Sequence, residues 1–147
     1  MPWIFLLIAL LAGAMMPTQA AMNNKLAAYL QSPVLSAFFS FAVGLVGLLI
    51  YIIVSRIPLS NLGNFRLAPP VSWIGGLCGA FFVTAVVIVV PRLGIALTFS
   101  IIILGQMMIT LPIDHFGFLG VPVREINIPR LIGILFVVIG VILIRRY

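Results

Sequence analysis

The chain has 147 residues, of which 64% are hydrophobic and only 7% carry a charge, and its formal net charge is +6. Soluble domains carry roughly 25% charged residues, so this composition excludes a water-soluble globular protein. The positive residues stand at the ends of long apolar stretches, which is the anchoring pattern of membrane helices and argues against nucleic acid as a partner.

Five uncharged stretches are long enough to cross a bilayer. A helix rises about 1.5 Å per residue, so about 20 apolar residues span a hydrocarbon core of roughly 30 Å. Because lipid requires backbone polar groups to be paired within each segment, we expect an all-α, polytopic bundle of five transmembrane helices forming one domain over residues 1–147. The sequence predicts these helices at about residues 2–22, 33–55, 71–90, 93–113 and 129–146.

The first stretch resembles a secretory signal, because Thr18-Gln19-Ala20 ends like a cleavage site. No Lys or Arg precedes its apolar residues, and a basic start is part of that signature. We therefore expect it to remain as a helix in the mature protein. Gln19 and Asn23 near its end are candidates for contact with a substrate, with helix capping as the alternative role.

Small residues recur on one face of several predicted helices. Membrane helices associate through close backbone approach, so such stripes are candidates for helix packing or for a dimer interface, packing being the commoner role. The candidates are Ser36, Ser40 and Gly44 in the second helix, Gly75, Gly76 and Gly79 in the third, and Gly133 and Gly140 in the fifth.

Trp73 stands directly before the first of the third-helix glycines. It is a candidate wall of a cavity for a cationic or flat ligand. Its position near the start of the helix favours the alternative, a residue of the aromatic belt at the membrane interface.

The fourth predicted helix carries the polar stripe with most functional promise. Gln106, Thr110 and Asp114 are spaced i, i+4 and i+8 and share one face, and Pro112 interrupts the helix nearby. A polar face, a kink and the sole aspartate predict a water-accessible pathway in which Asp114 carries protons. The alternative is an interfacial Asp114 that is solvated or paired with Arg124 or His115. His115 is a further candidate for the pathway, or a hydrogen-bonded loop residue.

Lysine and arginine divide evenly between the two sides that five spans define. An even distribution leaves the orientation in the bilayer unspecified, because Lys and Arg in short loops set it. We therefore expect dual topology, with two copies inserted in opposite senses as an antiparallel dimer, rather than an accidental tie. One side holds Arg56, Arg66, Arg124 and Arg130, and the other holds Lys25, Arg92, Arg145 and Arg146.

Several short segments, spread over most of the chain, together resemble one known group of proteins. This group is the YdcZ-type family of the drug/metabolite transporter superfamily, five-helix polypeptides of about this size. The glycines of the last stretch also resemble the dimerising helix of small multidrug resistance proteins. The segments are Asn23, Ser32-Pro33, Phe41-Ala42-Val43-Gly44, Trp73-Ile74-Gly75-Gly76, Pro91-Arg92-Leu93-Gly94, Gly105-Gln106, Ile113-Asp114-His115-Phe116-Gly117, and Gly133 with Gly140.

The resemblance implies a bacterial inner-membrane transporter half that works as an antiparallel homodimer or with a paralogous five-helix subunit. It names no cargo. Small multidrug resistance proteins carry a glutamate in their first helix that exchanges protons for cationic drugs. The first stretch of this chain has no acid, so that mechanism cannot be transferred to it.

The favoured function is a secondary transporter subunit that exports a small metabolite or drug by alternating access, coupled to protons. The alternative is a non-transporting subunit or assembly factor that docks a larger membrane partner. No enzyme activity, cofactor or metal is expected, because the sequence has no nucleophile–base arrangement and no cluster with metal-ligand spacing. The expected partners are the lipid bilayer, a second copy or paralogue, and a small-molecule substrate.

Overall fold

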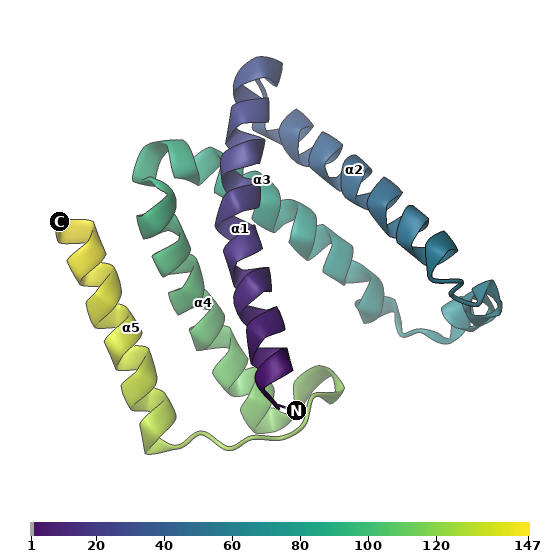
Figure 1. The fold of residues 1–147 in the computed structure, drawn as a ribbon. Helices are drawn as coiled ribbons and strands as arrows, with labels where there is room; N and C mark the ends of the chain where they lie inside the picture. The colour runs from purple at the N-terminus through teal and green to yellow at the C-terminus, as the bar shows by residue number, and fades with distance from the viewer. Residues whose placement is uncertain (1) are drawn as a thin grey trace. The chain divides into compact units, whose positions relative to one another are not determined.

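A computed structural model describes residues 2–147 and consists mainly of long α-helices (Figure 1). They are α1 (Pro2–Leu30), α2 (Pro33–Val54), α3 (Gly75–Leu93), α4 (Ile95–Phe116) and α5 (Ile128–Arg146), with short 3₁₀ helices η1 (Leu59–Leu67), η2 (Pro70–Ile74) and η3 (Phe118–Gly120) in the connections. Five helices, with η2 continuing into α3, are long and apolar enough to cross a membrane. The predicted all-α fold with five membrane-spanning helices is confirmed.

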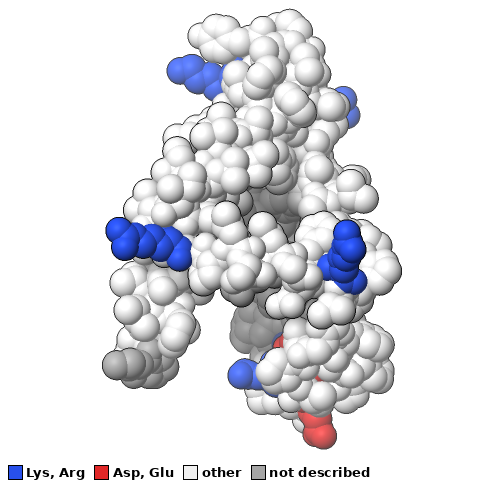
Figure 2. All heavy atoms as spheres, turned by 90° about the vertical axis from the view of Figure 1, so that its right-hand side faces the viewer, with Lys and Arg blue, Asp and Glu red and all other residues white. Residues whose placement is uncertain are grey.

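The chain divides between Pro91 and Arg92 into two compact units, and each is described by itself. In the first unit α1 packs against α2, and in the second α4 packs against α5 (Figure 1). Most of the surface visible in Figure 2 is uncharged, as a lipid-facing surface requires. The single five-helix domain and the antiparallel dimer stay predictions.

Three helices differ from the predicted bounds by more than one residue. α1 continues to Leu30 rather than ending at residue 22, because the residues after Met22 include good helix formers and Asn24 Nδ2 donates to Ala20 O within the helix at 2.9 Å. The third span starts as the 3₁₀ turn η2 and becomes α-helical at Gly75. α4 passes through Pro112 and ends at Phe116, where Gly117 adopts the left-handed conformation (φ 63°).

Ser36 of α2 lies at the contact between α1 and α2. The Ser36 side chain is fully buried, and its hydroxyl donates to the backbone carbonyl of Asn23 at 2.6 Å. Ala20 and Ala37 are buried as well, so small side chains let the two backbones approach. On the α3 side, a Cβ at Gly79 would lie 3.5 Å from the ring of Phe41 in α2. Ser36 and Gly79 thus lie at contacts between helices of this unit, and their packing roles stay predictions.

We expect Ser36→Leu to destabilise the protein by about 1–3 kcal/mol, because a larger side chain cannot fit at a fully buried position. Ser36→Ala removes only the hydrogen bond and should cost about 0.6 kcal/mol. Unfolding in mixed micelles measures both changes. The control is Val43→Leu on the exposed face of α2, which should change the unfolding midpoint little. Equal effects of the two leucine substitutions would contradict the packing role of Ser36.

Candidate functional site

The end of α4 and the start of α5 are held close together by the segment between them. α4 ends at Phe116, and the chain returns through residues 117–127 to α5. Asn127 caps α5, because its side-chain oxygen accepts a hydrogen bond from the backbone N–H of Arg130 at 3.0 Å. This cap fixes Arg130 in the first turn of α5, beside the last turns of α4.

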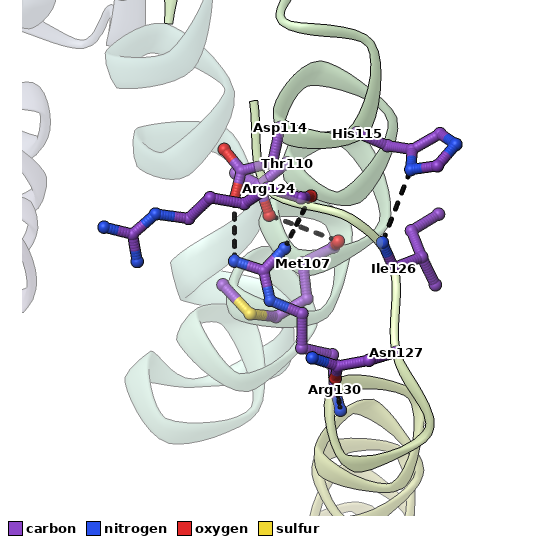
Figure 3. Close-up of polar contacts among 8 residues, drawn as sticks. All are labelled: Met107, Thr110, Asp114, His115, Arg124, Ile126, Asn127 and Arg130. Carbon is purple, nitrogen blue, oxygen red and sulfur yellow. Dashed lines mark hydrogen bonds and ion pairs between the residues drawn. The ribbon is translucent and has the colours of Figure 1, made fainter. Parts of the chain in front are cut away.

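An ion pair joins the two helices at this point. Arg130 Nη2 lies 3.1 Å from Asp114 Oδ2 (Figure 3), and the two side chains are 29% and 34% exposed. An exposed ion pair contributes only about 0–1 kcal/mol. In a membrane protein an unpaired charge is costlier, because lipid does not solvate it. The pair is therefore best regarded as a mutual neutralisation of two costly charges.

Further hydrogen bonds tie the connecting segment to the end of α4. The backbone N–H of Arg124 donates to Asp114 O at 2.8 Å, and Arg130 Nη1 donates to Arg124 O at 3.3 Å. His115 Nδ1 accepts from the N–H of Ile126 at 3.4 Å. The alternative in which the Asp114 carboxylate pairs with Arg124 or His115 is not found, since the carboxylate pairs with Arg130. The side chain of Arg124 extends away from the pair, and His115 faces the connecting segment (Figure 3).

A groove of about 550 Å³ runs from this ion pair along α4 and α5. Its two charged groups stand among largely apolar walls, with the Thr110 hydroxyl donating to Met107 O at 3.2 Å. Such a site offers an amphipathic ligand one polar anchor and an apolar wall. The groove is lined by Met107, Thr110, Leu111, Asp114, Arg130, Gly133, Ile134 and Val137.

The predicted polar stripe of α4 is only partly gathered in this groove. Thr110 and Asp114 line it, whereas Gln106 is exposed and lies outside the lining. Gly133, a candidate packing residue, also lines it. Sequence reasoning missed Arg130, which it counted only as a membrane anchor. The available signal was its place at the start of the next helix, where a short connection returns it to the end of α4.

The remaining candidates lie elsewhere. Trp73 packs against Phe65 of η1 with ring centroids 4.0 Å apart. Gln19, Asn23, Ser40 and Gly44 line grooves beside α1 and α2. A Cβ at each of Gly75, Gly76 and Gly140 would meet nothing within 4 Å. Within residues 2–147, no group of three His, Cys, Asp or Glu side chains could hold a metal ion.

The turn after α4 provides a test of how firmly residues 117–127, which connect α4 to α5, are held. Gly117 has φ +63°, and a Cβ there would lie 2.8 Å from Val123 Cγ2, whereas Gly120 has φ +81° and open space around it. Gly120→Ala should add only backbone strain of about 1–2 kcal/mol. Gly117→Ala adds a clash as well, so we expect it to accelerate hydrogen exchange at the Arg124 amide more strongly. Equal exchange rates in the two variants would contradict this account.

Comparison with known proteins gives one consistent result. The family described as "Putative inner membrane exporter, YdcZ" matches residues 4–143. The chain is 30% identical over 105 residues to the inner membrane protein YdcZ of Escherichia coli strain K12, an alignment that covers 69% of this chain and 70% of that protein. No solved structure matches the chain.

Proposed function

Because this chain belongs to the YdcZ family of inner-membrane proteins, we propose that it is one subunit of a secondary exporter for a small metabolite or drug. The five apolar helices agree with a multi-pass location in the inner membrane. Export proceeds by alternating access and is coupled to protons. The observation that carries this proposal is the Asp114–Arg130 ion pair at the polar end of the α4–α5 groove.

The ion pair is a proton-dependent contact between α4 and α5. When Asp114 is ionised, it holds Arg130, and Arg130 in turn holds the carbonyl of Arg124. Protonation of Asp114 removes the charge that Arg130 faces, so the link between α4 and the start of α5 weakens. The change at the end of α4 then drives the switch between the inward-open and outward-open states of the exporter. Loss of the proton on the other side of the membrane restores the pair and resets the cycle.

The working unit is a dimer of two inverted copies, or of this chain with a paralogous five-helix subunit. Two features support this assembly. The positive residues divide four against four between the two sides, which favours insertion in both senses. In addition, Gly140 of α5 has open space where a Cβ would stand and lies outside the lining of the α4–α5 groove, which leaves this part of the helix free for close approach by another.

The test compares the small molecules in the medium of cells that produce the protein with those of cells carrying an empty vector. Mass spectrometry should find at least one compound enriched outside the producing cells. That compound, loaded into proteoliposomes with purified protein, should then move when a pH gradient is imposed. If no compound differs and membrane partners co-purify instead, the chain is a docking subunit and the exporter proposal is wrong.

A further inference from the structure

A second groove lies in the first unit, between α1 and α2. It has a volume of about 380 Å³ and meets a neighbouring groove at Gln19 and Ser40, which line both. We call it the α1–α2 groove. Its lining carries hydroxyl and amide groups but no charge, and consists of Met15, Met16, Thr18, Gln19, Met22, Asn23 and Ser40.

The Asn23 side chain is the unusual member of this lining. It is only 5% exposed, and its Nδ2 has no hydrogen-bond partner in the described chain. The neighbouring Asn24 differs, because its Nδ2 donates to Ala20 O. Ser36 bonds the backbone carbonyl of Asn23 and leaves the side-chain amide unpaired. A buried amide without a hydrogen-bond partner is unfavourable.

The walls of the groove indicate what kind of molecule would supply that acceptor. Met15, Met16 and Met22 have flexible, polarisable side chains that adapt to different apolar or aromatic shapes. Because no charged side chain lines the groove, a charged ligand would enter without a counter-ion. The hydroxyl of Thr18 is already committed as a donor to Ala14 O, whereas the Asn23 amide still has hydrogens to donate.

We propose that the α1–α2 groove binds an uncharged, largely apolar small molecule whose carbonyl or ether oxygen accepts a hydrogen bond from Asn23. This assigns a substrate class to the export described above and rests on that function. The groove gives the apolar body of the substrate its binding surface, and the ion pair in the other unit responds to protons.

Benzophenone tests the proposal directly, since it is an uncharged aromatic ketone that inserts into nearby C–H bonds when irradiated. With the full-length protein in lipid nanodiscs, mass spectrometry should locate adducts on Met15, Met16 or Met22. Asn23→Leu should lower this labelling about tenfold at subsaturating probe, the loss expected for one hydrogen bond. The matched control is Asn24→Leu. The Asn24 amide is hydrogen-bonded within its own helix, so its removal should leave labelling unchanged.

Two further measurements keep the test decisive. Ser40→Leu fills the groove from the α2 side and leaves Asn23 intact, so it should also lower labelling. This variant replaces Asn23→Leu in the test if Asn23→Leu fails to fold. The anion 4-benzoylbenzoate should label the three methionines more weakly than benzophenone does. Labelling spread evenly over the helices, or unchanged in both the Asn23 and the Ser40 variants, would overturn the proposal.

The outcome is separable from that of the export experiment, because labelling measures binding without transport. Absent labelling in a protein that still exports its compound refutes the α1–α2 groove and leaves the exporter standing. Groove labelling in a protein that moves nothing keeps the binding site and refutes the exporter. A disulfide between Met22→Cys residues of two copies, formed in a Cys78→Ala background, would show that a second copy occupies the groove and would overturn the ligand.

Discussion

Asp114→Asn is expected to abolish proton-driven export, lowering the rate at least tenfold at every pH. Asparagine keeps the size of the side chain but can neither form an ion pair with Arg130 nor exchange a proton. The variant therefore lacks both the paired and the protonated state of Asp114. A tenfold loss corresponds to about 1.4 kcal/mol. Flux of the exported compound in proteoliposomes, with an imposed pH gradient, measures the effect, and size-exclusion chromatography shows whether the variant remains folded.

The chain offers a matched control for this experiment. Glu125 is the other acid, and it is exposed in the segment that connects α4 to α5. Glu125→Gln removes the same charge without touching the ion pair, so export should stay near the wild-type rate. Asp114→Glu should retain part of the activity and its pH dependence. Full, pH-dependent export by Asp114→Asn would show that the proton is carried elsewhere.

Removing two positive charges from one side should fix the orientation of the protein in the membrane. The wild-type tally is four against four, so a reporter fused after Tyr147 should be active in both compartments. The double variant Arg145→Gln with Arg146→Gln leaves two positive charges on the side of Tyr147 and four on the opposite side. The side with four charges then stays in the cytoplasm, so the reporter should move to the periplasm. Arg56→Gln with Arg66→Gln should do the reverse. Alkaline phosphatase and green fluorescent protein fusions measure the two populations.

Glu125→Gln again serves as the control, because acids contribute little to orientation. We expect it to leave the ratio of the two populations unchanged, whereas each double arginine variant shifts that ratio about tenfold or more. A wild-type reporter active in a single compartment would exclude the antiparallel homodimer. The paralogous five-helix subunit would then be the partner that completes the transporter.

The sequence predicted the helices well where local chemistry sets their ends. Ser32-Pro33 marks the start of α2, since Ser32 Oγ accepts from Leu35 N and Pro33 fits the first turn. The end of α1 was missed for a different reason. Hydropathy reports where a segment leaves lipid, and Asn23-Asn24-Lys25 do so, but backbone hydrogen bonding continues to Leu30.

The site was predicted only in part, because its geometry depends on the chain's return between α4 and α5. Helical spacing placed Thr110 and Asp114 together, and both line the groove. The partner of Asp114 lies sixteen residues further on, and its position depends on the turn at Gly117 and the cap at Asn127. Helical periodicity predicts neighbours within one helix and does not predict this contact between two helices. Gln106 shares the stripe by counting, yet it lies outside the groove.

The length of α1 has a mechanical consequence for the first unit. At 29 residues this helix is about 43 Å long, against roughly 30 Å of hydrocarbon, so it must tilt or protrude into the headgroups. α2 is fastened to it at Ser36 and must lean with it. Bilayers with shorter acyl chains therefore change the inclination of both helices at once, and membrane thickness becomes a variable that acts on this helix pair.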